Sequence, residues 1–205
     1  MRFTQMCVVL GMLTAPALAA AQIKQPGAHP LYSAELEPHL VVEWNDYAPC
    51  ANDAFGPGFR AAIPFLANGP IPRINNNMAI GFGLDWAHAG LNDNCGVYRN
   101  GAYNGGTGFS ADIWSIPVVV QWNFFLLPKI SVFGEGGLVI QHRRYDDGYY
   151  NGCTNGPNGF CRYTFTDTGV DASLSVGGRF LVTDSVGFLL RLGYPYLSAG
   201  VSILL

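Results

Sequence analysis

Apolar and polar residues alternate along much of this chain, most clearly in the segment from Asp184 to Leu205. On either side of Tyr194-Pro195, apolar side chains occupy even positions from Val186 to Leu192 and odd positions from Leu197 to Leu205. A two-residue turn at 194-195 is predicted to pair position 192 with 197 and position 190 with 199. Both apolar sets then lie on one face of a hairpin. Arg191, the only charge between the strand ends, falls on the opposite face.

The same alternation predicts six strands upstream of this hairpin. They span about 35–44, 58–66, 78–86, 113–124, 130–141 and 168–182. Together with the final hairpin they make eight strands, each close to the length that crosses a bilayer when tilted. An even number of antiparallel strands, apolar on one face and polar on the other, is the pattern of a transmembrane barrel. The prediction is an all-β protein: an eight-stranded antiparallel transmembrane β-barrel with an apolar exterior and a polar, plugged lumen.

The predicted connections between strands differ in length according to the side of the membrane. Long loops are expected at 45–56, 87–112 and 142–167, and short turns at 126–129 and 183–185. If the N-terminus is periplasmic, the long loops lie outside the cell and these short turns inside, which is the usual asymmetry. Two connections depart from it, a longer periplasmic turn at 67–77 and the short outer turn at 194-195.

Charged residues of the predicted strands share the inward parity. They are Glu37, His39, Glu43, Arg60, Asp85, Glu135, Asp171, Arg179 and Arg191. An arginine on the lipid face at the bilayer midplane costs about 2–4 kcal/mol, which favours this assignment strongly. An eight-stranded barrel is just wide enough for side chains to fill it, so we interpret the set as an ion-pair network plugging the lumen. Arg191 is expected to have Glu37 and Glu43 as partners. The alternative is a narrow polar path for protons or small solutes.

Tryptophans fall near the predicted strand ends on the apolar face. Trp44, Trp86 and Trp114 lie at outer ends, and Trp122 lies toward an inner end. Tryptophan is enriched at membrane–water interfaces, so these residues predict two aromatic girdles. The alternative is that they are ordinary core aromatics.

Residues 1–21 are typical of a cleaved secretory signal peptide. They contain Arg2, an apolar stretch from Met6 to Leu18, and an A-x-A motif at 17–19 or 19–21. Residues 22–34 are then predicted to be a periplasmic N-terminal lead-in, and residues 35–205 the barrel domain. Lys24 and Lys129 are the only lysines, which argues against an exterior that faces water. The formal net charge of -3 indicates no nucleic-acid partner.

Four cysteines follow the predicted signal peptide, all in predicted outer loops: Cys50, Cys95, Cys153 and Cys161. An even number in an exported chain predicts two disulfides. Three pairings are possible, and we favour 153 with 161 and 50 with 95. A metal site is the alternative, but the chain has no CxxC motif and no nearby histidine pair. We therefore predict neither a metal nor a cofactor.

The alternation and the last strand, YLSAGVSILL, make the chain resemble the small eight-stranded outer-membrane barrels of the OmpA/OmpX type. The resemblance is architectural and covers about Leu31 to Leu205. It implies location in the outer membrane, contact with its lipids and lipopolysaccharide, and insertion by the barrel-assembly machinery. Those families usually end in an aromatic residue that assists assembly, whereas this sequence ends in Leu205.

The predicted outer loops are rich in tyrosine, asparagine and glycine, the composition of adaptable recognition surfaces. The tyrosines are Tyr47, Tyr98, Tyr103, Tyr145, Tyr149, Tyr150 and Tyr163. We expect a non-catalytic role, structural or in surface interaction such as adhesion or ligand contact. Loops that simply solvate the surface are the alternative reading of this composition.

A small-solute channel is the second hypothesis for the function, and a lipid-modifying enzyme is the third. His142 lies at an outer strand end, where Thr166 and Thr168 could neighbour it on the next strand. An active site of this kind needs a nucleophile and a base at the membrane edge. The chain has no His-x-Ser pair like that of the lipid A deacylases and no GxSxG motif. No catalytic residue is therefore predicted.

Overall fold

A computed structural model of the chain describes residues 22–44, 53–90, 96–99, 102–105, 110–151 and 160–205. Ten strands lie within these ranges. They are β1 (Glu35–Glu43), β2 (Ala54–Leu66), β3 (Asn76–Ala89), β4 (Gly96–Arg99), β5 (Ala102–Gly105), β6 (Ser110–Leu127), β7 (Ile130–Asn151), β8 (Phe160–Leu181), β9 (Val186–Tyr194) and β10 (Tyr196–Leu204). In this part of the chain, no helix has the length and hydrophobicity needed to cross a membrane.

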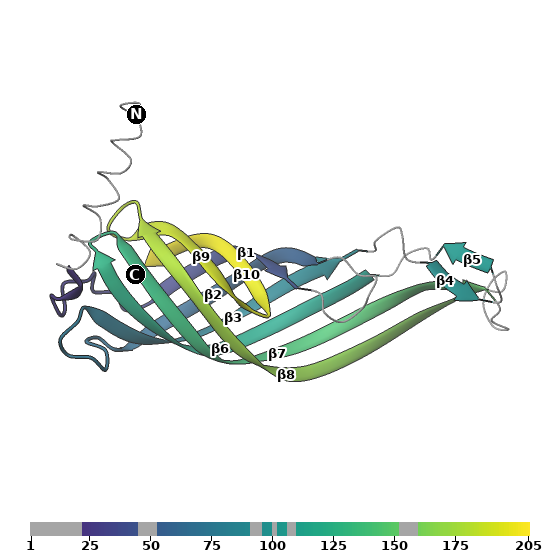
Figure 1. Cartoon of the computed structure of the whole chain (residues 1–205), viewed down its shortest axis with the longest axis horizontal. Helices are drawn as coiled ribbons and strands as arrows, with labels where there is room; N and C mark the ends of the chain where they lie inside the picture. Colours follow the sequence, from purple (N-terminus) through teal and green to yellow (C-terminus); the bar gives the residue numbers. More distant parts are fainter. Residues whose placement is uncertain (1–21, 45–52, 91–95, 100–101, 106–109, 152–159) are drawn as a thin grey trace, which may run out of the picture.

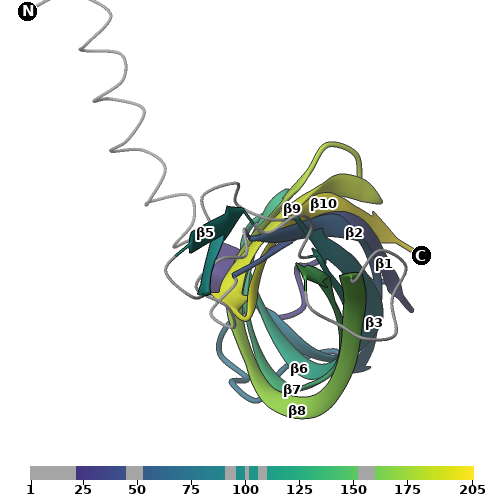
Figure 2. The same cartoon turned by 90° about the vertical axis from the view of Figure 1, so that its right-hand side faces the viewer.

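Eight of the strands close into one barrel in the order β1-β10-β9-β8-β7-β6-β3-β2, and every neighbouring pair is antiparallel. Figure 2 looks along the barrel, where these strands form a closed ring. The short strands β4 and β5 pair with each other, apart from the barrel. The prediction of an all-β, eight-stranded antiparallel barrel is confirmed.

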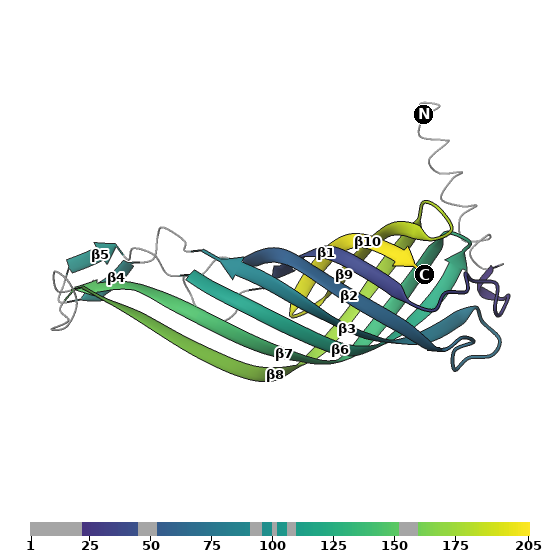
Figure 3. The ribbon, with the colours of Figure 1, turned by 180° about the vertical axis from the view of Figure 1, so that it is seen from behind.

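The final hairpin has the register that its alternation predicts. Leu192 lies opposite Leu197, and Leu190 lies opposite Ala199. β10 then pairs with β1 along its length, from Leu204 opposite Glu35 to Tyr196 opposite Glu43, and so closes the barrel. Figure 3 shows β10 beside β1. A shift of one residue would exchange the two faces of a strand, so the apolar face of the hairpin determines this register.

The two faces of the wall differ sharply in polarity. Along β9 the side chains alternate between outside and lumen: Leu190 is 56% exposed and Arg191 is 1% exposed. The exposed large side chains of the barrel are apolar, including Phe59, Phe82 and Val118. Buried positions carry glutamate, arginine, serine, asparagine and glutamine. This inverts the arrangement of a soluble protein and matches the predicted apolar exterior and polar interior.

Two strands, β7 and β8, extend far beyond the rest at one end of the barrel, whereas β6 reaches only about as far as β3. β7 and β8 have 22 residues each and β6 has 18, whereas β1, β9 and β10 have 9 each. Figure 1 shows β7 and β8 running out past the barrel toward the β4–β5 hairpin. We call residues 143–151 of β7 and 160–167 of β8 the projecting sheet; they pair from Arg143–Asp167 to Asn151–Phe160.

The projecting sheet corrects the prediction of two long loops at 87–112 and 142–167. Most of the second range is strand, as the end of β7 and the start of β8, and the first contains the end of β3, β4, β5 and the start of β6. β2 also starts at Ala54, inside the loop expected at 45–56. Hydrophobic alternation marks strands with one face in lipid. Strands that face water on both sides lack it, so the sequence pattern could not reveal these extensions.

The lead-in, residues 22–34, lies at the opposite end of the barrel from the projecting sheet (Figure 1). It meets the last strand there, since the Ser33 amide donates to the Leu205 carbonyl at 2.7 Å and the Leu205 amide to the Ala34 carbonyl at 2.9 Å. We call this the inner end and the opposite one the outer end. The predicted signal peptide, residues 1–21, lies outside the described residues.

Candidate functional site in the lumen and at the outer end

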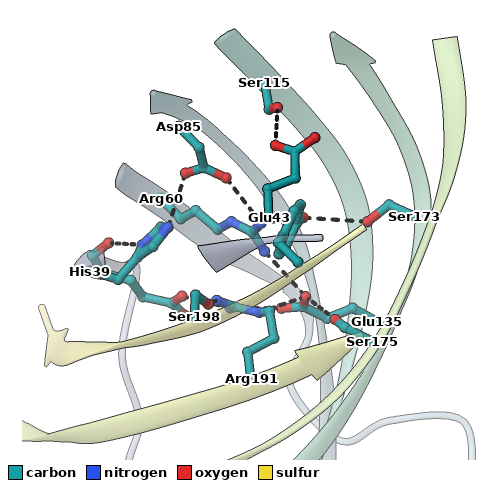
Figure 4. Close-up of polar contacts among 12 residues, drawn as sticks. His39, Glu43, Arg60, Asp85, Ser115, Glu135, Ser173, Ser175, Arg191 and Ser198 are labelled. Atoms are coloured by element: carbon teal, nitrogen blue, oxygen red, sulfur yellow. Dashed lines mark hydrogen bonds and ion pairs between the residues drawn. The ribbon is translucent and has the colours of Figure 1, made fainter. Parts of the chain in front are cut away.

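Arg191 of β9 is the centre of the lumen contacts (Figure 4). Its Nη2 donates to Glu37 Oε2 of β1 at 2.7 Å. Its Nε and Nη2 donate to the two carboxylate oxygens of Glu135 on β7, at 2.8 and 2.9 Å. Nη1 donates to the Ser198 hydroxyl at 3.1 Å. One guanidinium therefore connects four strands and neutralises two buried carboxylates, one of them through a bidentate pair.

Arg60 of β2 extends this group toward the outer end. Its guanidinium donates to Glu135 at 3.3 Å and to Asp85 of β3 at 3.4 Å. It also donates to the Tyr196 hydroxyl and lies over that ring, with 4.9 Å between Cζ and the centroid. His39 Nε2 lies 2.9 Å from Asp85 Oδ1. Figure 4 shows these side chains converging from different walls of the barrel.

Arg179 forms a separate pair nearer the inner end. It donates to Glu35 of β1 and to the Ser131 hydroxyl, the latter at 3.2 Å, and Ser202 donates to the same glutamate. Phe133 separates this pair from the central group. The guanidiniums of Arg179 and Arg191 lie 5.9 and 5.3 Å from its ring centroid, a cation–π geometry.

Glu43 lies in a third set of contacts, nearer the outer end. It accepts hydrogen bonds from Gln141 and from Ser115, the latter at 3.5 Å. Arg143 donates to Gln141 and reaches Asp171 at 3.3 Å. The Asp171 side chain is 39% exposed, unlike the carboxylates deeper in the lumen.

The nine expected lumen residues therefore fall into three groups. Six belong to one connected group: Glu37, His39, Arg60, Asp85, Glu135 and Arg191. Arg179, Glu43 and Asp171 belong to the inner and outer sets. The expected contact between Arg191 and Glu37 is present, but the expected contact with Glu43 is wrong. Glu43 lies higher in the lumen and accepts hydrogen bonds from Gln141 and Ser115 instead.

Sequence reasoning missed Glu35, Arg143 and Gln141 as members of these sets. Glu35 and Gln141 have the inward parity of predicted strands, so the alternation was sufficient to find them, whereas Arg143 falls in the range predicted as a loop. Tyr196 also has the inward parity of its strand, but its contacts with Arg60 and with Ser173, the latter at 3.4 Å, depend on how the strands are arranged.

Side chains fill the lumen along its length. The charged side chains of the central group are 0–3% exposed, so water-sized spaces do not reach them. Toward the outer end lies a buried apolar cluster of Val41, Ala54, Ala87, Ala89, Ala111, Ile113, Tyr145 and Tyr196. Within the described residues, no group of three or more His, Cys, Asp or Glu side chains is arranged to hold a metal ion.

The tryptophans lie at two levels of the outer wall. Trp86 and Trp114 pair across β3 and β6 with ring centroids 6.4 Å apart, and Trp114 lies opposite His142. At the inner level, Trp122 lies opposite Gly134, and its indole nitrogen donates to Asn76 at 2.9 Å. Trp44 follows β1, and its indole nitrogen donates to the Gly193 carbonyl at 3.3 Å.

Two histidine pairs face outward near the upper tryptophan level. His142 Nδ1 lies 2.8 Å from the Thr168 hydroxyl, and His88 Nδ1 lies 2.9 Å from Asp112. The first pair joins a base to a hydroxyl, as a nucleophilic site requires. No contact within the described part of the chain links the two pairs or orients the second ring nitrogen of His142. The arrangement is therefore a hydrogen-bonded pair and not a catalytic triad.

The predicted disulfides fall on residues that lie mostly outside the described part of the chain. Cys50, Cys95 and Cys153 lie outside it, and the side chain of Cys161 is likewise not described. The two disulfides stay a prediction.

Comparisons with known proteins identify no family for this chain. No family model matches it, and no curated protein matches it. Among solved structures, it is similar to Ail, the attachment invasion locus protein of Yersinia pestis, with 10% sequence identity, a TM-score of 0.45, and coverage of 83% of this chain and 97% of that chain. A second structure, Ail in complex with the heparin analogue sucrose octasulfate, gives 11% identity, the same TM-score of 0.45 and the same coverage of 83% and 97%. At this identity the likeness concerns the fold alone.

Proposed function

We propose that this chain is an integral outer-membrane β-barrel whose role is non-catalytic surface interaction through the projecting sheet. Location in the membrane is supported by the two tryptophan levels and the apolar wall between them. On β7 these levels correspond to Gly134 and His142. A strand rises about 3.3 Å per residue, so the levels are about 26 Å apart along the strand. With the tilt of about 35–45° that such strands have, the separation along the membrane normal is about 20 Å, somewhat less than the apolar band of about 25 Å in outer-membrane barrels.

Export through a cleaved signal peptide and insertion by the barrel-assembly machinery belong to the same proposal. The inner end, with the lead-in, then faces the periplasm, and the projecting sheet faces the cell exterior. Just above the upper tryptophan level, the outward face carries His88, Asp112 and Arg144. These side chains lie at the depth of the lipid headgroups, where lipopolysaccharide and other outer-membrane lipids supply phosphates and sugars as polar partners.

The proposed interaction role rests on one observation: β8 has a long free edge that runs through the projecting sheet. β8 pairs with β9 only from Leu174 to Leu181, whereas it pairs with β7 from Phe160 onward. Within the described residues, the stretch 160–173 therefore has a neighbouring strand on one side alone. An edge of this kind presents unpaired amide and carbonyl groups that can pair with an extended segment of another chain.

The charges of the projecting sheet favour recognition through the main chain. Arg143 and Arg144 lie near Asp146, Asp167 and Asp171, with ion pairs of 3.3–3.8 Å among them. Basic and acidic groups are thus interspersed, and the whole chain has a formal net charge of -3. Among the side chains that the structure describes in this sheet, a polyanion finds no basic patch, whereas an extended polypeptide requires none.

The other two hypotheses, a small-solute channel and a lipid-modifying enzyme, have less support from the contacts among the described residues. A channel needs a continuous water path, but the central side chains are 3% exposed or less. A lipid-modifying enzyme needs an oriented base and stabilisation of the oxyanion beside its nucleophile. The pair of His142 and Thr168 supplies the base and the hydroxyl alone.

The test is to remove the projecting sheet and keep the barrel. A two-residue Asn-Gly turn between His142 and Thr168, which lie opposite each other, would delete residues 143–167 and with them the whole projecting sheet. Cells that produce the full chain or the shortened chain are compared for adhesion to surfaces coated with casein, an unfolded polypeptide, or with heparin. Cells with the full chain are expected to adhere to casein more strongly than cells with the shortened chain.

Equal adhesion by both chains would contradict the interaction role. Stronger adhesion of the full chain to heparin than to casein would contradict recognition of extended polypeptide. Both chains must reach the outer membrane and shift in gel mobility on heating, as folded barrels do. This control separates loss of adhesion from loss of folding.

A further inference from the structure

The lead-in closes over the inner end of the barrel through contacts along its whole length. Near its start, the Asn75 amide donates to the Ile23 carbonyl at 2.7 Å. Near its end, the Tyr32 hydroxyl accepts from Asn77 Nδ2 at 3.2 Å, and Ser33 bonds to the last strand. His29, between these points, is 7% exposed. The lead-in is therefore a strap held at both ends and in its middle.

His29 has an acceptor at each of its two ring nitrogens. Nε2 lies 2.8 Å from the carbonyl oxygen of Ala67, in the turn between β2 and β3. Nδ1 lies 3.0 Å from the carbonyl oxygen of Pro30. A neutral imidazole has a hydrogen on one nitrogen and a lone pair on the other, whereas an imidazolium has a hydrogen on both. A backbone carbonyl oxygen can only accept, so only the protonated ring makes both hydrogen bonds.

The third contact of the ring also favours a positive charge. His29 stacks on Phe125, at the inner end of β6, with centroids 4.6 Å apart and an interplanar angle of 18°. An aromatic face attracts a cation placed over it. Without its proton the ring loses this attraction and one hydrogen bond, and it brings a lone pair against a carbonyl oxygen.

Glu35, at the start of β1, is the acid next to the lead-in, and it is paired with Arg179. The segments around His29 carry four other charged or titratable groups. They are Lys24 and Tyr32 in the lead-in, Arg73 in the turn at 67–75, and Lys129 beyond the end of β6. Burial raises the pKa of the Tyr32 hydroxyl above its ordinary value, so it keeps its proton over the physiological range. Histidine is the residue type that ordinarily changes charge between pH 5 and 8.

We propose that the lead-in is a pH-dependent strap, held across the inner end of the barrel when His29 is protonated and loosened when it is neutral. Acidification on the side of the membrane that the inner end faces is therefore expected to hold the strap in place. It does not depend on what the projecting sheet binds, so it can fail or succeed independently of the adhesion test.

The experiment is nuclear magnetic resonance of the mature chain in detergent micelles between pH 5 and pH 8. Nitrogen-15 shifts of the His29 ring report its protonation. The hydrogen-exchange protection factor of the Asn75 amide, corrected for intrinsic exchange at each pH, reports docking of the strap through its bond to Ile23. The protection factor is expected to fall by about tenfold or more as the ring loses its proton, since one hydrogen bond to a charged group is lost.

His29→Gln has an amide group that carries no positive charge at either pH and cannot place a donor at both ring-nitrogen positions, so it is expected to show the low protection at both pH values. His88→Gln, at the outer end, is the matched control and is expected to keep the wild-type response. Unchanged strand amide signals show that each variant is folded. Two results would overturn the proposal: a His29 ring that stays neutral down to pH 5, or Asn75 protection that stays constant while the ring titrates.

Discussion

Arg191 and Glu135 form a bidentate ion pair across the lumen, with nitrogen–oxygen distances of 2.8 and 2.9 Å. They come from β9 and β7, which are not neighbours in the sheet, since β8 lies between them. The pair therefore connects two strands that are separated by β8, and not two adjacent strands. Glu37 and Arg60 complete the group, so that each buried charge has an opposite charge beside it.

Removing one member of this pair is expected to destabilise the barrel strongly. Arg191→Met leaves Glu37 and Glu135 with fewer donors in a buried site, and breaking a buried ion pair in this way costs about 3–5 kcal/mol. The free energy of unfolding, from urea titrations of protein inserted in lipid vesicles, measures the loss. Arg144→Met, at an exposed position on β7, is the control and should cost less than about 1 kcal/mol. Equal stability of the two variants would show that the network does not support the fold.

Replacing both members is expected to cost less than the two single changes together. Glu135→Leu alone leaves Arg191 and Arg60 with fewer buried acceptors. The double variant Arg191→Met with Glu135→Leu removes both the guanidinium and the carboxylate of the pair, so neither is left buried without the other. A double-mutant cycle of unfolding free energies should give a coupling of about 1–3 kcal/mol. Strictly additive effects would mean that the two residues act independently despite their contact.

Two adjacent glycines of β7 are expected to differ in how much a substitution by alanine changes the stability of the barrel. A Cβ at Gly137 would lie 2.2 Å from the Val118 carbonyl oxygen and 2.7 Å from Val119 Cα, both backbone atoms of β6. A Cβ at Gly136 would meet only Leu174 Cδ1, at 3.9 Å, on the outer wall. Gly137→Ala should therefore cost about 1–3 kcal/mol of unfolding free energy. Gly136→Ala should be neutral or stabilising. A larger loss of unfolding free energy at Gly136 than at Gly137 would contradict the assignment of Gly136 to the outer wall and Gly137 to the lumen.

A charge on the outer wall should be tolerated only beyond the membrane. Leu138 lies midway between the levels of Gly134 and His142, and Leu138→Arg is expected to lower the unfolding free energy by about 2–4 kcal/mol. Thr166→Arg places the same side chain on β8 within the projecting sheet and should change the unfolding free energy by less than about 0.5 kcal/mol. If both substitutions cost the same, the span of the membrane has been assigned wrongly.

The sequence predicts those parts of the fold in which alternate residues must be apolar, where they face lipid, and polar, where they face the lumen. The register of Leu192 with Leu197 follows from this rule alone. The projecting sheet does not, because neither of its faces is expected to lie in lipid, and Arg144 or Thr166 is as acceptable there as an apolar residue. Alternation also identified the inward charges, but their pairing depends on strand tilt and stagger. Arg191 therefore meets Glu135, two strands away, while Glu43 lies too far toward the outer end to reach it.

The lead-in shows a second limit of sequence analysis. Its contacts with the barrel run through backbone carbonyls, such as those of Ile23 and Ala67, which every sequence possesses. Only His29, a lone histidine in a segment rich in proline and glycine, distinguishes this stretch, and its acceptors become visible only in three dimensions.

The most direct test of the membrane-spanning barrel is the contact between detergent or lipid chains and the protein. Nuclear Overhauser effects from acyl-chain protons to backbone amides can be mapped along β7 and β8 in micelles or nanodiscs. The account predicts strong effects from the level of Gly134 to that of His142, with a maximum near Leu138, and none in the projecting sheet. Effects that continue evenly through residues 143–151, or a mature chain that remains monomeric in buffer without detergent, would contradict it.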